Sequence, residues 1–262
     1  MQLTVVVPPE VLYDGYRFAS GVSLGWRKHC SDLINIWHWS RREPQRLLDI
    51  ASNDGTLVNL AQTLGWDALG LDPSPIGDYP VVQGYWPEAQ KDLKGLYDLI
   101  VAQNVFGHTD RPQAFLQAAK ASLAPRGRIV VECPDALTML TGTQFDQVYH
   151  EHLSYWSLFP LWKLALRVGL SVYDVECLPV HGGSLRYWLG HVDEPTVATR
   201  TVNHRLKVEE VLHTPNATRN FAVRANVELT NLANRLTESV QDGNLLCAYG
   251  ASAKGNVLLN AL

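Results

Sequence analysis

Short apolar runs alternate with amphipathic segments through the middle of the chain. The runs have the length of strands, and the segments between them repeat their apolar residues at helical spacing. Such alternation is typical of parallel βαβ units in an α/β fold. We therefore expect strands at 46–50, 67–72, 80–83, 97–103 and 128–132, with helices between them. The helix at 111–123 has the clearest start, because Pro112 stands at an early helical position.

The pattern changes in the C-terminal part of the chain. A helix at 159–168 is followed by predicted strands at 170–177 and 184–189, which are suited to form an antiparallel edge. Residues 203–242 are polar with a stripe of leucines and are predicted to be helical. The final stretch, 245–262, is predicted to form a strand, a glycine turn and a helix. A single βα unit cannot bury both faces of its strand, so we expect this strand to join another element or the chain to be a truncated form.

Composition and charge narrow the class of protein. The chain has 262 residues, of which 46% are hydrophobic, enough for a full core in one domain or one and a half. Its charge of 22 minus 26, or −4, argues against a dedicated nucleic-acid binder. No apolar run reaches the ~20 residues of a membrane span and no signal peptide is recognisable, so we expect a cytoplasmic protein. The cysteines stand singly, which indicates neither a disulfide framework nor a zinc knuckle.

The turn after the first predicted strand is the first candidate site. It reads Asp49-Ile-Ala-Ser-Asn-Asp-Gly55, and small residues here let a ligand approach the backbone and the amides at the start of the following helix. Asp72 ends the next strand, where a carboxylate can accept ribose hydroxyls. A dinucleotide site would prefer GxGxxG, so the pattern AxNxG favours S-adenosylmethionine (SAM) over NAD. An ordinary βα turn with an incidental acid is the alternative.

Proton-transfer groups gather in two further segments. His108 lies in the loop 104–110, directly after the strand at 97–103, where open α/β sheets bind ligands. The segment 145–154 contains Tyr149-His150-Glu151-His152, and a helix there would place Tyr149 and His152 on one face. His150 and His152 would not converge on a metal and no third ligand motif is present, so we expect an acid/base cluster and no metal. A structural polar network is the alternative.

Two glycine-containing segments each carry a cation. They are Pro179-Val-His-Gly-Gly-Ser-Leu-Arg186 and Gly250-Ala-Ser-Ala-Lys-Gly-Asn256. Backbone amides of the second segment could hold a phosphate with the help of Lys254. The order of a P-loop is missing, so a nucleotide triphosphatase is not favoured. A tight turn with a surface cation is the alternative for either segment.

Taken in order, several segments resemble one family. They are LDIASNDGTLV, GLDPS, VAQNVFGHTD, VECPDA, FDQVYHEHLSYWSL, LPVHGGSLR and YGASAKGN. From about Tyr13 to the C-terminus the chain resembles the SAM-dependent C-methyltransferases of nucleotide-deoxysugar biosynthesis, which methylate carbon 3 of dTDP-4-keto-deoxyhexoses. The resemblance implies an α/β fold with the Rossmann-like sheet of class I SAM methyltransferases and a truncated C-terminal α/β substrate domain. It divides the chain into a helical lead-in (1–44), a SAM-binding methyltransferase domain (45–190) and a partial nucleotide-sugar-binding domain (191–262).

The resemblance also implies a role for each matching residue. His152 aligns with the family's general base, which removes the C3 proton of the sugar. Tyr149, Glu151 and His108 align with polar residues of the same site, and Tyr16 with a stretch that closes over it. The implied cofactor-binding residues are Asp49, Ala51, Ser52, Asn53, Gly55, Asp72, Pro73, Gln83 and Asn104. The implied substrate-binding residues are His181, Gly182, Arg186, Lys254 and Asn256.

Two departures from the family bear on the function. The family's N-terminal zinc module and most of its C-terminal domain have no counterpart in this chain, so we expect binding of SAM to be retained more fully than binding of the dTDP moiety. We expect a SAM-dependent C-methyltransferase that acts on a dTDP-sugar through an enolate. The alternatives are an O- or N-methyltransferase of another small metabolite and a truncated, non-catalytic SAM-binding paralogue. A homo-oligomer that completes the C-terminal sheet would explain the abrupt end of the chain.

Overall fold

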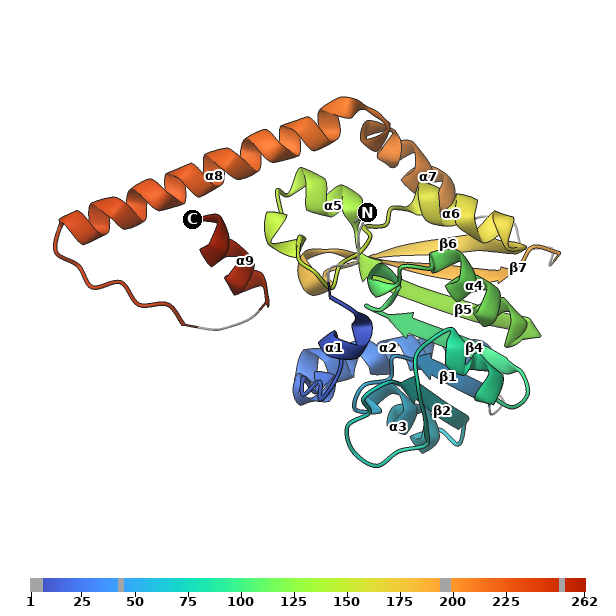
Figure 1. The fold of residues 1–262 in the computed structure, drawn as a ribbon. Coiled ribbons are helices and arrows are strands. Elements are labelled where there is room, and N and C mark those ends of the chain that lie inside the picture. Colours follow the sequence, from blue (N-terminus) through green and yellow to red (C-terminus); the bar gives the residue numbers. More distant parts are fainter. Residues whose placement is uncertain (1–6, 42–44, 194–198, 250–252) are drawn as a thin grey trace.

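A twisted sheet forms the centre of the molecule. The computed structural model describes residues 7–41, 45–193, 199–249 and 253–262. Its strands are β1 (Arg46–Ile50), β2 (Asp67–Asp72), β3 (Val81–Gln83), β4 (Tyr97–Gln103), β5 (Leu123–Pro134), β6 (Leu170–Leu178) and β7 (Ser184–His191). Within the described residues they form one seven-stranded sheet in the order β3-β2-β1-β4-β5-β7-β6 (Figure 1).

The predicted strand directions are confirmed. Strands β3, β2, β1, β4 and β5 pair in parallel, as βαβ units require. Strand β7 pairs antiparallel with both β5 and β6, so the edge expected from 170–177 and 184–189 is present. The sheet is therefore a parallel sheet extended by an antiparallel hairpin.

Alternate residues of the central strands enter two separate cores. Leu47, Leu99 and Val130 contact one cluster of apolar side chains, whereas their neighbours along the strands contact the other. All three are fully buried. A strand buried on both faces reads as a continuous apolar run, which is why these segments are recognisable in the sequence.

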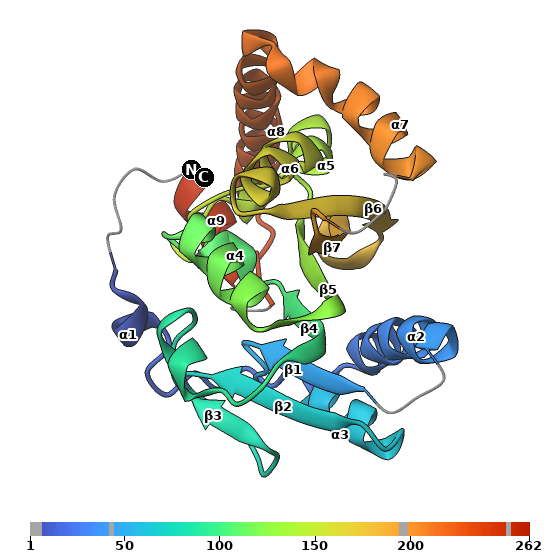
Figure 2. The same ribbon diagram turned by 90° about the vertical axis from the view of Figure 1, so that its right-hand side faces the viewer.

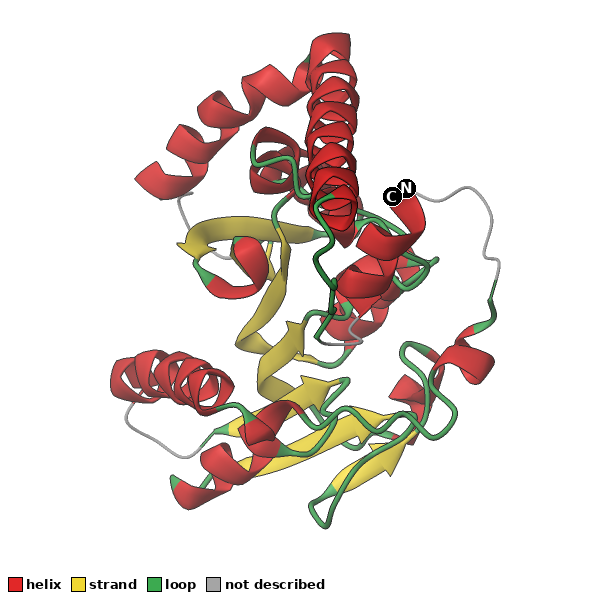
Figure 3. Ribbon diagram, turned by 90° about the vertical axis from the view of Figure 1, so that its left-hand side faces the viewer, coloured by secondary structure: helices red, strands yellow, loops and turns green. Residues whose placement is uncertain are grey.

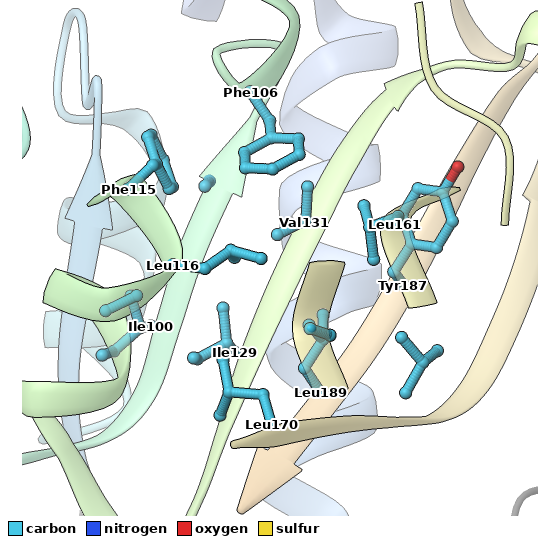
Figure 4. Packing of buried hydrophobic residues seen from close by; sticks show 14 of the residues in the cluster. Ile100, Phe106, Phe115, Leu116, Ile129, Val131, Leu161, Leu170, Tyr187 and Leu189 are labelled. Carbon is cyan, nitrogen blue, oxygen red and sulfur yellow. The ribbon is translucent and has the colours of Figure 1, made fainter. Parts of the chain in front are cut away.

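Helices cover both faces of the sheet. One face is covered by α2 (Leu24–Arg41) and α3 (Thr56–Thr63), and the other by α4 (Pro112–Ala121) and α6 (Leu158–Arg167) (Figure 2). Figure 4 shows Ile100, Ile129 and Val131 of the strands beside Phe115 and Leu116 of α4. These buried contacts fix the carboxyl ends of the parallel strands, where ligands bind in such folds.

The C-terminal helices lie at the edge of this layered core, and the first of them joins it through the buried side chain of Val202. They are α7 (Arg200–Val208), α8 (Pro215–Gln241) and α9 (Ala253–Ala261), while α1 (Pro9–Leu12) and α5 (Ala136–Thr141) are short. Figures 1 and 3 show α8 extending away from the sheet. In the view of Figure 1, α9 is drawn below α8. None of the helices in the described residues is long and apolar enough to cross a membrane.

The predictions for the C-terminal region need two corrections. Residues 203–242 are not one helical stretch, because the chain is extended at Thr214 before Pro215 begins α8. A residue that precedes proline avoids the helical conformation, which separates α8 from the elements before it. The strand predicted from Leu245 is wrong, since residues 244–249 have no regular structure. A strand needs a neighbour for its backbone hydrogen bonds, and the sheet of the described residues offers none there.

Candidate active site

Many of the predicted site residues lie at the carboxyl ends of β1, β2 and β4. Strand β1 lies between β2 and β4, and the chain order of the strands reverses at this point. The two loops that leave β1 and β4 therefore lie at a topological switch point, where open α/β sheets bind ligands. The Ala51–Gly55 turn leaves β1, and the loop with Asn104 and His108 leaves β4.

The turn after β1 is compact because three of its residues adopt left-handed backbone conformations. The φ angles are 60° at Ala51, 52° at Asn53 and 69° at Gly55. At Gly55 a side chain would also come within 2.4 Å of the Tyr79 ring, so only glycine fits. The amide of Ala51 donates to the carbonyl of Leu71 over 2.7 Å, which fixes the turn against β2.

Asp72 stands at the end of β2 with a defined orientation. Its carboxylate is nearly buried and accepts the backbone N–H groups of Asn53 and Ser74, each over 2.8 Å. A carboxylate offers about four lone-pair sites, so two amides leave capacity for hydroxyl groups of a ligand. The geometry therefore suits a ribose acid.

Residues 16–21 form an N-terminal strap that is bonded to the same turn. The Asn53 side-chain oxygen accepts the amide of Ser20 over 2.9 Å, and its side-chain nitrogen donates to the carbonyl of Phe18 over 2.7 Å. The amide of Gly21 donates to Asp54 over 2.6 Å. The side chain of Asn53 thus holds the strap, and the strap brings Tyr16 to the site.

Two predicted cofactor residues lie inside the protein beneath the turn. The Ser52 hydroxyl is 3.0 Å from the Tyr79 hydroxyl, and both Ser52 and Asp49 are buried. Burial, together with the nearby carboxylates of Asp72 and Asp54, raises the pKa of Asp49 well above its usual value. These two side chains support the turn from below.

His152 is held in one orientation by the backbone. It is 7% exposed, and its Nδ1 lies 2.8 Å from the carbonyl oxygen of Gln147. Because a carbonyl can only accept, Nδ1 carries the proton and the neutral ring has its basic lone pair on Nε2. Burial lowers the pKa of His152, and the positive charge of Lys254 acts in the same direction. At neutral pH the ring is therefore set up to take a proton.

His108 and two tyrosines lie beside this ring. The ring centroids of His108 and His152 are 5.3 Å apart, and the Tyr13 hydroxyl is 3.0 Å from Nδ1 of His108. Burial and the neighbouring His152 lower the pKa of His108 to about 3, so it is neutral. Tyr16 packs against Tyr13 at 5.8 Å between ring centroids, and burial raises the pKa of Tyr16.

The remaining residues of the YHEH segment also contribute. Residues 148–155 are not helical, yet Tyr149 and His152 do meet, with ring centroids 4.1 Å apart. A turn closed by the His152 amide and the Tyr149 carbonyl, 3.0 Å apart, produces the same i,i+3 proximity as a helix. Burial raises the pKa values of Tyr149, to about 12, and of Glu151, whereas His150 is exposed. The structure thus brings together Tyr149, Glu151 and His152.

A pocket lies between the loop that follows β4 and the segment that carries His152. It is lined by Asn104, Gly107, His108, Cys133, Pro134, His152, Ser154 and Tyr155. The amide of Ser154 donates to the carbonyl of Gly107 over 3.0 Å, which ties the two loops together. Asn104 thus lies beside the proton-transfer groups. Of the other predicted cofactor residues, Gln83 donates its side-chain amide over 3.1 Å to the carbonyl of Pro73, the residue that follows Asp72.

The predicted substrate residues fall into two groups. The Nε2 atom of His181 lies 3.3 Å from the Asn104 amide nitrogen, so the His181-Gly182 loop borders the site. Lys254 lies close enough for its charge to act on His152. Asn256 instead accepts a hydrogen bond from Asn260 within α9, over 3.0 Å. Gly250, at the start of the GASAKGN segment, lies outside the described residues.

Arg186 is placed in the sheet and does not line the pocket. It is 2% exposed and donates to Glu132 over 2.6 Å and to Glu176 over 3.2 Å. The other Glu132 oxygen lies 2.6 Å from Nε2 of His29. This guanidinium therefore neutralises the buried carboxylate of Glu132 and also pairs with the partly exposed Glu176, which sequence spacing alone could not reveal.

Sequence reasoning missed two residues that the structure adds to the site. Tyr13 contacts His108 from 95 positions away, and Gln147 holds His152. Tyr13 stands three residues before Tyr16, and Gln147 stands inside the YHEH-containing segment. The sequence signal for both residues is that each lies within five positions of a predicted site residue.

Family models match both parts of the chain. A model described as a methyltransferase domain matches residues 25–175. A second model, described as a C-methyltransferase C-terminal domain, matches residues 179–262. The chain is also 29% identical, over 279 aligned positions, to the C-methyltransferase NovU of Streptomyces niveus. That alignment covers 100% of this chain but 66% of the relative, so the chain spans about two thirds of its length.

Solved structures share the fold at low sequence identity. The 1,6-didemethyltoxoflavin-N1-methyltransferase of Burkholderia thailandensis, solved with S-adenosylhomocysteine, has a TM-score of 0.51 at 15% identity, covering 64% of this chain and 78% of its own. The PH0226 protein of Pyrococcus horikoshii has a TM-score of 0.53 at 13% identity, covering 70% and 97%. The expected fold of class I SAM methyltransferases is confirmed.

Proposed function

Because the chain belongs to the methyltransferase domain family, we propose that it is a SAM-dependent enzyme that methylates C3 of a nucleotide-linked 4-keto-deoxysugar. The match of residues 179–262 to the C-methyltransferase C-terminal domain supports carbon as the methyl acceptor. The similarity to NovU, itself a C-methyltransferase, supports the same choice. A dTDP-linked sugar is the substrate that the sequence resemblance indicates.

The residues at the end of β1 and β2 fit SAM. The Asp72 carboxylate is oriented by two backbone amides and can accept the ribose hydroxyls, while the small residues of the Ala51–Gly55 turn leave room for close approach to the backbone. When bound, SAM supplies a methyl group made electrophilic by its positively charged sulfur. The strap carrying Tyr16 then closes the site from the N-terminal side and limits the access of water.

His152 is the general base of the proposed reaction. Its Nδ1–H is bonded to the Gln147 carbonyl, so Nε2 takes the proton from C3 of the sugar. Its lowered pKa keeps the ring neutral near pH 7. The single observation that carries the proposal is this fixed tautomer in a pocket that also contains Asn104 and His108 of the loop after β4.

The enolate that results needs hydrogen-bond donors at its oxygen. Tyr149 and His108 flank His152 and are both uncharged at neutral pH. In this proposal the Tyr13 hydroxyl, 3.0 Å away, donates to Nδ1 of His108, and the Nε2–H of that ring is then the donor available to the enolate oxygen. Preorganised donors aimed at a developing oxyanion lower the barrier to proton removal from carbon.

Deuterium exchange tests the function. The chain, incubated in deuterated water with S-adenosylhomocysteine and a dTDP-4-keto-deoxysugar, should exchange the C3 hydrogen, because only carbon methylation needs an enolate. The variant His152→Asn should lose exchange and methyl transfer by at least about 100-fold while binding S-adenosylhomocysteine normally. The control His150→Asn changes an exposed neighbour and should retain both activities.

Each alternative predicts a different result. An O- or N-methyltransferase would transfer methyl groups without exchanging hydrogen at carbon. A non-catalytic paralogue would bind S-adenosylhomocysteine in a calorimetric titration and catalyse neither reaction. Full activity of His152→Asn would exclude His152 as the base.

A further inference from the structure

Gln147 holds the ring of His152 through its backbone. It is 2% exposed and ends the short helical turn Phe145–Gln147. Its carbonyl oxygen accepts two hydrogen bonds, from Nδ1 of His152 over 2.8 Å and from the Tyr155 hydroxyl over 3.2 Å. A buried carbonyl with two donors has both lone pairs engaged, which restricts its orientation.

The side chain of the same residue reaches a second loop. Its amide nitrogen donates to the carbonyl of His181 over 2.9 Å. His181 has φ of 53°, a left-handed conformation that is uncommon for a residue with a side chain. The loop 180–183 therefore depends on partners such as this hydrogen bond to keep its shape. Its His181 ring contacts Asn104 beside the pocket.

We propose that Gln147 is a positioning residue that fixes His152 in its Nδ1–H tautomer and couples this tautomer to the conformation of the 180–183 loop. The inference rests on the proposed function in one respect, the role of His152 as the base. The backbone carbonyl that orients the ring and the side chain that holds the loop belong to one buried residue. A shift of the loop therefore displaces the carbonyl that His152 needs.

The coupling has a direct consequence for the reaction. A substrate that seats on the His181-Gly182 loop also sets the position of the base, so proton removal is efficient only when the loop is in place. Removal of the Gln147 side-chain amide uncouples the two elements while His152 itself is unchanged. The expected effect is on kcat more than on KM, because Gln147→Met changes no side chain of the loop and Gln144 still holds the loop at Gly182.

A matched control is present three residues earlier. Gln144 also donates its side-chain amide to this loop, to the carbonyl of Gly182 over 2.7 Å. Its carbonyl instead accepts the backbone amide of Gln147 over 3.2 Å, whereas the carbonyl that Nδ1 of His152 contacts is that of Gln147. Gln144→Met and Gln147→Met thus remove the same kind of hydrogen bond from the same loop, and only the second loosens the residue that holds the base.

The first measurement is the nitrogen-15 NMR spectrum of the imidazole of His152 in the ligand-free protein. The wild-type ring should be the Nδ1–H tautomer, and Gln147→Met should show a mixture of tautomers, whereas Gln144→Met should resemble the wild type. Charged and titratable groups around the ring also affect its titration, and all are retained in both variants. They are His108, Tyr149, Glu151, Tyr155, His181 and Lys254.

The second measurement is steady-state kinetics as a function of pH. Gln147→Met should lower kcat about tenfold with KM nearly unchanged, and should move the acidic limb of the kcat profile to lower pH. The direction follows because the hydrogen bond to the carbonyl favours the protonated ring. Gln144→Met should leave this limb in place.

The proposal is overturned by an Nε2–H tautomer in the wild-type protein, or by equal tautomer spectra in the two variants. The wild-type spectrum tests the fixed tautomer even where Gln147→Met fails to fold. Failure of the proposed function produces a different result: His152→Asn then stays active although the tautomer is fixed as described. The two failures are thereby distinguishable.

Discussion

The sheet region, residues 45–191, and the C-terminal helical region, residues 200–262, are built in opposite ways. In the sheet region, β1, β4 and β5 carry fully buried side chains on both faces. In α8, which has 27 residues, Ala225 is the buried one among those described, and Val227 and Val240 are more than half exposed. An apolar run that is buried on both faces indicates a strand with neighbours on both sides. A mostly polar sequence with helical periodicity indicates a helix but not what the helix packs against.

The two regions nevertheless meet at a well-ordered junction. Glu209, which follows α7, is completely buried and accepts the amides of Leu158 and Phe159 at the start of α6, over 2.8 and 2.9 Å. It also accepts Nε of Arg205 over 2.8 Å, and Arg205 pairs in turn with Asp135. The C-terminal region is therefore anchored by these charged groups as well as by Val202 and Leu206 of α7, whereas the sheet is held mainly by apolar contacts.

The largest effect is expected at this junction. Glu209→Ala leaves two helix amides and the Arg205 guanidinium without their acceptor in a buried place, so it should lower the free energy of unfolding by about 3–5 kcal/mol. Denaturant titration measures the change. Glu210→Ala is the control, because its side chain is exposed and the expected change is within about 0.5 kcal/mol. Equal stabilities of the two variants would contradict the anchoring role.

The next largest effect is expected from shortening a buried aliphatic side chain of the sheet region, compared with an exposed one of the C-terminal region. Ile129→Ala removes a fully buried side chain of β5 and should cost about 2–5 kcal/mol of unfolding free energy. Val227→Ala removes a side chain of α8 that is 51% exposed and should cost less than about 0.5 kcal/mol. Thermal and chemical unfolding of both variants test the contrast. A large loss at Val227 would show that this face of α8 is covered in solution.

The same contrast explains what could be predicted from the sequence. The strands at 46–50 and 97–103 were predictable because a strand that is buried on both faces has a run of consecutive apolar residues. The contact between Tyr149 and His152 is predicted for a helix and is made by a turn, since both place residues i and i+3 together. The strand predicted from Leu245 does not form, because a strand depends on a partner that no local pattern reveals.

Long-range side-chain contacts were the least predictable part of the site. Arg186 follows a glycine pair that is typical of a binding loop, yet its partner Glu132 lies 54 positions away in the adjacent strand. Tyr13 reaches His108 across 95 positions. Sequence motifs identify residues with reactive or charged side chains. The tertiary structure decides which of these side chains pair with each other inside the protein and which face a ligand.

The smallest expected effect concerns the charge that the C-terminal region lends to the site. Lys254 lies on α9, and its positive charge lowers the pKa of His152 by disfavouring the imidazolium, in addition to the larger effect of burial. Lys254→Gln should therefore raise the pKa of His152, measured by NMR titration of the ligand-free protein so that substrate contacts do not interfere. Since the base must be neutral, the acidic limb of the kcat profile should move to higher pH in the same variant. Lys254→Arg keeps the charge and should leave both unchanged, and high salt should shrink the difference between wild type and Lys254→Gln. An unchanged pKa in Lys254→Gln would mean that α9 does not approach His152 in solution, and the C-terminal region would then contribute to the fold at its junction but not to the electrostatics of the site.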